Sequence, residues 1–230
     1  MKKSLVFIAA LLTCCMAKAQ DEANSIPFSK LQIGIEAAPA MAGQSGIPAG
    51  GTPKPLFGFS AGFTGLYSFN ESWAIWAGLG FDQKGNEITL LFTNNNGQNT
   101  GQSADIKDFF DYLDIPVLAR YNFPGTLHFF ANAGPYIGYL LSDIGYTTFN
   151  DNGQYPQPGP VNYTHYDKRF DAGACLGIGF NKSISDKILL ELELRGNFAV
   201  TPVIPASPVG LGIHNQSLNL LIGARYKLAQ

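Results

Sequence analysis

Cysteine is scarce in this chain of 230 residues. Of its three cysteines, Cys14 and Cys15 lie within the first 19 residues, and Cys175 stands alone in the remainder. One cysteine cannot close an intramolecular disulfide, and no group of histidines and cysteines has the spacing of zinc ligands. We therefore expect no disulfide and no zinc site, with Cys175 as a small buried residue.

The chain also has few histidines and no excess of basic charge. Its three histidines, His128, His165 and His214, are scattered, and no neighbouring serine or carboxylate gives them a catalytic spacing. Without Lys2, Lys3 and Lys18, the 15 Lys and Arg residues fall to 12, against 17 Asp and Glu. A mildly acidic chain is not typical of nucleic-acid binding. The sequence predicts neither an enzyme nor a cofactor site.

Long apolar runs are missing after the first 19 residues. Residues 1–19 combine Lys2 and Lys3, a short apolar run and the small-residue site Ala17-Lys18-Ala19, which predicts a secretory signal peptide cleaved after Ala19. A lipoprotein signal acylated on Cys14 or Cys15 is the alternative. No later segment has the roughly 20 apolar residues of a transmembrane helix. We assign residues 20–29 to an N-terminal periplasmic segment and residues 30–230 to one domain.

Alternation of apolar and polar side chains takes the place of long runs. In residues 57–69 one face is apolar and consists of Phe57, Phe59, Ala61, Phe63, Gly65, Tyr67 and Phe69. Leu66 is the exception, since it lies on the opposite face. A period of two over this length predicts a long strand with one apolar face. The same pattern defines eight strands, at 31–37, 57–69, 73–82, 113–123, 127–141, 170–181, 188–197 and 218–227.

The connections between these strands alternate in length. Residues 70–72, 124–126 and 182–186 are tight turns, whereas 41–54, 86–108, 145–165 and 202–215 are long and rich in Gly, Pro and Asn. Short periplasmic turns and longer extracellular loops are the connections of an outer-membrane barrel. The pattern predicts an all-β fold: an eight-stranded antiparallel up-and-down transmembrane β-barrel.

Aromatic side chains gather near both ends of the predicted strands, which is typical of the two girdles at a membrane's interfaces. We expect these membrane-interface aromatics to point outward: Phe57, Tyr67, Phe69, Trp73, Phe81, Phe109, Tyr121, Phe123, Phe129, Tyr139, Phe170, Phe180, Phe198 and Tyr226. Phe63, in the middle of its strand, is an exception.

The opposite face carries charge of both signs. By parity, six acids and six bases point into the lumen as a charge network: Glu36, Asp82, Lys84, Asp114, Arg120, Arg169, Asp171, Glu191, Glu193, Arg195, Arg225 and Lys227. Buried charges persist when they are paired, so the balance predicts a largely filled lumen. Pro116 interrupts one strand, and we expect it at a bulge or where its missing N–H faces luminal water.

The segment YLDIPVLARYNF, residues 112–123, resembles a motif of the outer-membrane β-barrel family of Bacteroidetes-type bacteria, often labelled porin-family or PorT-like. Leu113, Asp114, Ile115, Pro116, Leu118, Arg120 and Tyr121 carry the likeness; FFANAGPYIGYLL at 129–141 and LNLLIGARYKL at 218–228 are similar to later strands. The resemblance implies an eight-stranded barrel in the outer membrane of a Gram-negative bacterium. It implies no catalytic or ligand-binding residue.

Three functions remain open from the sequence. The first is a structural or interaction barrel that contacts outer-membrane lipid, the barrel assembly machinery and an extracellular ligand or protein through loops 86–108 and 145–165. The second is a narrow porin-like channel for ions or small solutes. The third is a soluble lipocalin-like carrier of a hydrophobic ligand, which would turn the apolar faces inward.

Overall fold

The computed structural model describes residues 29–46, 52–125, 128–153, 155–203 and 212–229. The predicted signal peptide and residues 20–28 lie outside these ranges. Within the described residues there is no helix, and hence no helix that could cross a membrane. The strands are β1 (Leu31–Ser45), β2 (Thr52–Lys54), β3 (Leu56–Ser68), β4 (Trp73–Thr93), β5 (Asn99–Asn122), β6 (Phe129–Asn150), β7 (Val161–Asn162), β8 (Phe170–Ser183), β9 (Ile188–Ala199) and β10 (His214–Ala229).

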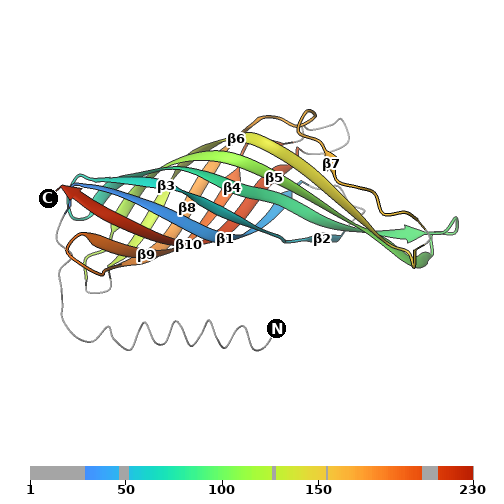
Figure 1. The fold of residues 1–230 in the computed structure, drawn as a ribbon, viewed down its shortest axis with the longest axis horizontal. Helices are drawn as coiled ribbons and strands as arrows, with labels where there is room; N and C mark the ends of the chain where they lie inside the picture. The colour runs from blue at the N-terminus through green and yellow to red at the C-terminus, as the bar shows by residue number, and fades with distance from the viewer. Residues whose placement is uncertain (1–28, 47–51, 126–127, 154, 204–211, 230) are drawn as a thin grey trace, which may run out of the picture.

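Eight of the strands close into a ring (Figure 1). The order is β4-β3-β1-β10-β9-β8-β6-β5, and pairing between β4 and β5 completes the circle; the two short strands β2 and β7 attach to β4 and β6. All neighbouring strands run antiparallel. The predicted eight-stranded antiparallel barrel is confirmed.

The apolar faces of the strands point outward. Phe57 and Phe63 on β3 are 75% and 73% exposed, whereas the exception in the pattern, Leu66, is buried with Trp76 and Leu118 inside the ring. Ionised side chains such as Lys84 are buried in the interior. The hypothesis of a soluble carrier is therefore wrong, because such a carrier would place its apolar faces around an internal ligand.

Three prolines lie within the eight strands of the ring, and each interrupts the ladder to one neighbour. The pairs between β4 and β5 skip Pro116, those between β5 and β6 skip Pro135, and those between β1 and β10 skip Pro39. The register is the same on both sides of each gap. Because proline has no N–H, it removes a rung without adding a residue. The predicted bulge at Pro116 is therefore wrong.

The segment 86–108, predicted as a loop, is a strand hairpin. Strands β4 and β5 stay paired from Trp73–Tyr121 as far as Thr93–Asn99, and β6 continues beside β5 to Asn150. These three strands have 21, 24 and 22 residues, whereas a tilted strand needs about 9–11 to cross the hydrocarbon. We call residues 87–93, 99–108 and 144–150 the outer extension; it projects at the end opposite the C-terminus (Figure 1).

Candidate functional site

The fourteen aromatic residues predicted at the membrane interfaces all lie on the outside of the ring. Eleven are exposed, and Phe81, Phe109 and Tyr121 are partly covered by neighbours. Trp73 on β4 packs against Tyr121 on β5 at 4.9 Å between ring centroids, and Tyr139 on β6 meets Phe170 on β8 at 5.4 Å. Such neighbours on adjacent strands form the outward bands that a barrel places at headgroup level.

The lumen is filled by layers of side chains, and an apolar cluster lies outward of the layer that contains Lys84. Phe110 and Tyr112 of β5, Leu140 of β6 and Val203 form one buried cluster. Val203 follows β9, where its backbone N–H donates to the Ile213 carbonyl and its carbonyl accepts from the Lys168 N–H. The segment after β9 thus turns inward and places an apolar side chain over the mouth of the barrel.

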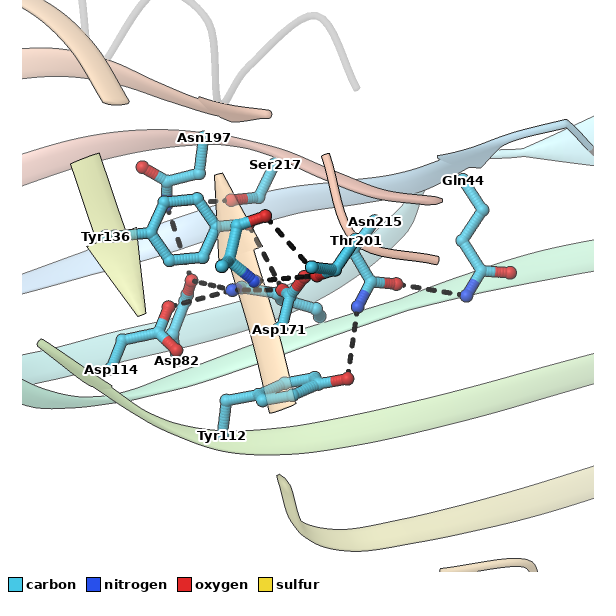
Figure 2. A network of polar contacts seen from close by, with 12 residues as sticks. Gln44, Asp82, Tyr112, Asp114, Tyr136, Asp171, Asn197, Thr201, Asn215 and Ser217 are labelled. Carbon is cyan, nitrogen blue, oxygen red and sulfur yellow. Dashed lines mark hydrogen bonds and ion pairs between the residues drawn. The ribbon is translucent and has the colours of Figure 1, made fainter. Parts of the chain in front are cut away.

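The second layer is centred on Lys84. Its ammonium lies 2.8 Å from Asp114, 3.0 Å from Asp171 and 3.9 Å from Asp82, and the rings of Tyr112 and Tyr136 lie 4.8 and 4.3 Å from it. The Lys84 side chain is 1% exposed. Figure 2 shows the three carboxylates arriving from different strands, so this one residue ties together β4, β5 and β8.

The carboxylate of Asp171 has further partners in this layer. The Tyr136 hydroxyl donates to Asp171 at 3.1 Å, and the Thr201 hydroxyl donates to its other oxygen at 3.3 Å. Asn197 donates to Asp82 at 3.4 Å and to the Ser217 hydroxyl at 3.1 Å (Figure 2). Because these residues come from β6, β9 and β10 and from Thr201 just after β9, the layer crosses the barrel.

A mixed third layer separates Lys84 from the remaining charges. It contains a cluster of buried residues: Leu66, Ala74, Trp76, Leu118, Tyr136 and Cys175. The expectation that Cys175 is a buried residue is confirmed, since it is a free thiol 2% exposed. The guanidinium of Arg195 lies 4.3 Å from the centre of the Trp76 ring, which joins this layer to the next.

The fourth layer holds the arginines. Arg195 pairs with Glu36 at 3.0 Å and with Glu193 at 2.8 Å, and Asn132 donates to Glu193 at 3.0 Å. Arg120 and Arg225 both pair with Glu191, so that carboxylate bridges β5, β9 and β10. The Arg120 guanidinium also stacks 3.5 Å from the centre of the Phe130 ring.

Ten of the twelve predicted luminal charges therefore meet in ion pairs. The other two do not: Arg169 is half-buried and donates to the Leu140 carbonyl at 3.1 Å, and the buried Lys227 ammonium has no hydrogen-bond partner among the described residues. The same alternation also directs the side chains of Tyr112, Trp76 and Phe130 into the lumen, and the sequence analysis did not include these three among the luminal residues. Each of the three has an even residue number, like the charged residues of its own strand or the strand's other luminal positions. The prediction considered only charged side chains and so left them out.

The outer extension has its own set of polar contacts. Lys54 pairs with Glu87 at 3.7 Å and with Asp105 at 3.5 Å, and Asn150 donates to Asp105 at 3.0 Å. Hydrogen bonds from Thr89 and Asn150, together with the Lys54 charge, hold the pKa of Asp105 below its usual value. These contacts link β2, β4, β5 and β6, so the extension is a braced sheet.

Aromatic side chains cover part of the outer extension and its surroundings. Phe109 and Tyr146 lie edge to face at 5.8 Å, and Tyr155 packs on Phe149 at 6.0 Å. The outer extension and the segment after β6 also expose further large side chains: Leu91, Val161, Tyr163 and Tyr166. The backbone of Phe149 exchanges two hydrogen bonds of 2.8 Å with the side-chain amide of Gln157, which blocks that rung of an otherwise open strand edge.

Over the described ranges, no three or more His, Cys, Asp or Glu side chains are gathered so that they could hold a metal ion directly. The buried carboxylates of the Lys84 layer and of the fourth layer instead face the lysine, arginine, amide and hydroxyl groups described above.

Comparison with solved structures gives barrels of low sequence identity. Neisserial surface protein A is 16% identical, with 87% of this chain and 98% of that chain covered and a TM-score of 0.43. The attachment invasion locus protein Ail of Yersinia pestis is 14% identical, with coverages of 86% and 97% and a TM-score of 0.39. OprG of Pseudomonas aeruginosa is 14% identical, with coverages of 88% and 98% and a TM-score of 0.40.

Curated proteins give no match to the sequence. A family model does match, over residues 18–204, and its description is outer membrane protein beta-barrel domain. The match covers most of the chain, and the ring of eight strands with outward aromatics and a charged interior agrees with it. The chain therefore belongs to the family of outer membrane protein β-barrel domains and is an outer-membrane β-barrel protein.

Proposed function

We propose that this barrel is a non-catalytic, closed membrane anchor whose outer extension is the surface for extracellular contacts. The observation that carries the proposal is the filled lumen. An apolar layer that contains Phe110, Leu140 and Val203 lies over the Lys84 layer, and side chains continue below it to Arg120 and Phe130. An eight-stranded barrel has an interior just wide enough for side chains, so these layers support a lumen without a continuous aqueous path.

The outer extension supports the second half of the proposal. A sheet that continues well beyond the bilayer needs polar contacts between its strands. Such contacts are made by Lys54, Glu87, Asp105 and Asn150. Exposed tyrosines are common in protein contact surfaces because they add large area with little conformational freedom to lose. The aromatic group of Tyr146, Tyr155, Tyr163 and Tyr166 is therefore the surface we assign to a partner.

Three finer assignments belong to the same proposal. The charge and small-residue pattern of residues 1–19 supports export through a cleaved signal peptide, and the barrel assembly machinery would then insert the chain. The segment Leu113–Tyr121 supports membership of the PorT-like branch of Bacteroidetes-type bacteria. Each assignment rests on sequence alone, and N-terminal sequencing of the protein from outer membranes tests the first.

A closed lumen predicts no steady conductance. We expect the purified barrel, reconstituted in a planar bilayer, to give no stable open-channel current in concentrated potassium chloride. Replacing Val203 and Leu140 with serine removes apolar groups from the outer layer and provides the comparison. Regular single-channel steps from the unaltered protein would overturn the closed-lumen proposal and favour the narrow channel.

The contact surface can be shortened without touching the membrane part. Removing residues 91–103 and joining Leu90 to Ala104, which are paired across the hairpin, through Asn-Gly should still give a tight turn. We expect the barrel to keep its faster migration on SDS gels before boiling, with a stability change within about 1 kcal/mol. Adding Tyr146→Ser and Tyr166→Ser to this variant also removes two of the tyrosines assigned to the partner. Attachment of cells carrying the combined variant to immobilised proteins and polysaccharides should fall severalfold, and unchanged attachment would contradict the proposal.

A further inference from the structure

A small cavity lies next to the Lys84 layer, at the wall formed by β3 and β4, and it is bordered by luminal residues and by the outward-facing Phe63 and Leu79. Its wall on one side is the bare backbone of Gly62, Gly78 and Gly80 on β3 and β4. A Cβ atom at Gly62 would lie 2.8 Å from the Gly80 Cα, and one at Gly78 would lie 2.8 Å from the Trp76 ring. The absence of side chains at these positions therefore both permits the close packing and leaves the space open.

Unpaired polar atoms converge on this cavity. Six buried side-chain atoms without a hydrogen-bond partner in the described structure belong to residues that line it: Ser60 Oγ, Trp76 Nε1, Asp82 Oδ1, Asp114 Oδ1, Asn197 Oδ1 and Asn219 Oδ1. Each of these residues is more than nine-tenths buried. Buried polar atoms in folded proteins nearly always have partners, so a shared set of orphans around one space indicates an occupant.

The chemistry of the wall indicates a cation. Five of the six unpaired atoms are oxygens, and Glu36 adds a third carboxylate, while no lysine or arginine lines the cavity. In the Lys84 layer three carboxylates, Asp82, Asp114 and Asp171, face one lysine. In the fourth layer three arginines balance three carboxylates: Arg120, Arg195 and Arg225 against Glu36, Glu191 and Glu193. The uncompensated negative charge therefore lies in the Lys84 layer, where burial makes it costly.

The size of the cavity limits the occupant. It offers about 50 Å³ to the centres of water-sized particles, and one water needs about 10–15 Å³ on that measure, so about three or four particles fit. Magnesium gives up its water shell reluctantly and so does not suit this space. The carboxylates do not converge as a direct ligand set, and the Trp76 N–H needs an acceptor, so water must accompany the ion.

We propose that this cavity binds one partly hydrated monovalent cation, of the size of sodium or potassium. Asp82, Ser60, Asn197 and Asn219 supply oxygen atoms to the ion or its waters, and a bound water accepts the hydrogen of the Trp76 indole. The cation neutralises part of the negative charge that Lys84 leaves uncompensated in its layer. It thereby acts as an internal structural ion of the barrel.

Thallium(I), a potassium-sized ion with strong anomalous scattering, is the probe. The barrel is refolded and crystallised in thallium(I) acetate, and the anomalous difference map is calculated. We expect a peak inside the cavity beside Asp82. Density for water alone at this position would overturn the proposal, because the carboxylates would then be neutralised by protons.

Two matched variants separate this site from the ion pairs around it. Asp82→Asn removes a charge and an oxygen ligand from the cavity wall, whereas Asp171→Asn removes the same charge from the Lys84 layer without touching the wall. Urea unfolding is compared in potassium acetate and N-methylglucamine acetate of equal ionic strength. We expect potassium to stabilise the unaltered barrel and the Asp171→Asn variant, with apparent potassium affinity at least about tenfold weaker in Asp82→Asn.

Asn219→Leu keeps every charge and provides the test of the cavity if Asp82→Asn does not fold. It removes one neutral oxygen from the wall, and it should also weaken the potassium effect. Equal stability of the unaltered barrel in the two salts, or an equal potassium effect in all variants, would show that the cavity holds no such ion.

Discussion

Replacing Lys84 with methionine should lower the free energy of unfolding of the barrel by about 3–5 kcal/mol. Methionine fills nearly the same volume between the rings of Tyr112 and Tyr136, so the loss is electrostatic. The change leaves Asp114 and Asp171 without the ammonium that lies 2.8 and 3.0 Å away. Removing one member of a buried ion pair costs more than the pair itself contributes, because the remaining charges stay buried.

Lys54→Met is the control for this prediction. Lys54 also contacts two carboxylates, Glu87 and Asp105, but its side chain is 46% exposed. An exposed ion pair contributes about 0–1 kcal/mol, so this variant should unfold at nearly the same urea concentration as the unaltered barrel. Adding Asp114→Asn to Lys84→Met should recover part of the loss, because it removes one of the unpaired charges. Equal, small effects of both lysine changes would contradict the assignment of Lys84 as the centre of the layer.

The sequence could predict which residues face the lumen, but not which of them meet. A period of two assigns Lys84, Asp114 and Asp171 to the same face of their strands, and this needs no knowledge of the ring. Their contact depends on the stagger between strands, which brings Lys84 to Asp171 across 87 positions of sequence. The same limit hid the cavity, because its wall is assembled from residues of all eight strands of the ring.

The sequence pattern predicts loops where the structure has the outer extension, and the reason is physical. Beyond the bilayer both faces of a strand meet water, so the apolar alternation that identifies a membrane strand disappears. Glu87, Thr89 and Lys107 are polar on a sheet that is nevertheless fully paired. The clear turn signal was Asn94-Asn95-Asn96-Gly97, where Asn94 accepts backbone hydrogen bonds from Asn96 and Gln98 and Gly97 has a φ of 74°. A turn of this kind in the middle of a polar segment is better interpreted as a hairpin.

Phe63→Arg should destabilise the barrel in a lipid bilayer by about 2–4 kcal/mol. Phe63 is 73% exposed on the outside of β3 and pairs with Ile35 and Leu79, which are also exposed. It lies on the same face as Phe57 and Tyr67, between the two aromatic bands, and so faces the middle of the hydrocarbon. A charge at that depth loses its hydration, and no acidic side chain on this face compensates it.

Phe57→Arg, on the same strand and face, is the matched control. Phe57 is 75% exposed and lies in the outer aromatic band, where an arginine can extend to the headgroups and costs about 0–1 kcal/mol. Both variants are compared by urea unfolding from phospholipid vesicles, with migration on SDS gels as the check of folding. The difference between them should largely vanish in detergent micelles, which deform around a charge more easily than a bilayer does. If the two arginines have the same small effect in vesicles, then Phe63 does not lie at the bilayer centre, and the two aromatic bands do not mark the membrane boundaries.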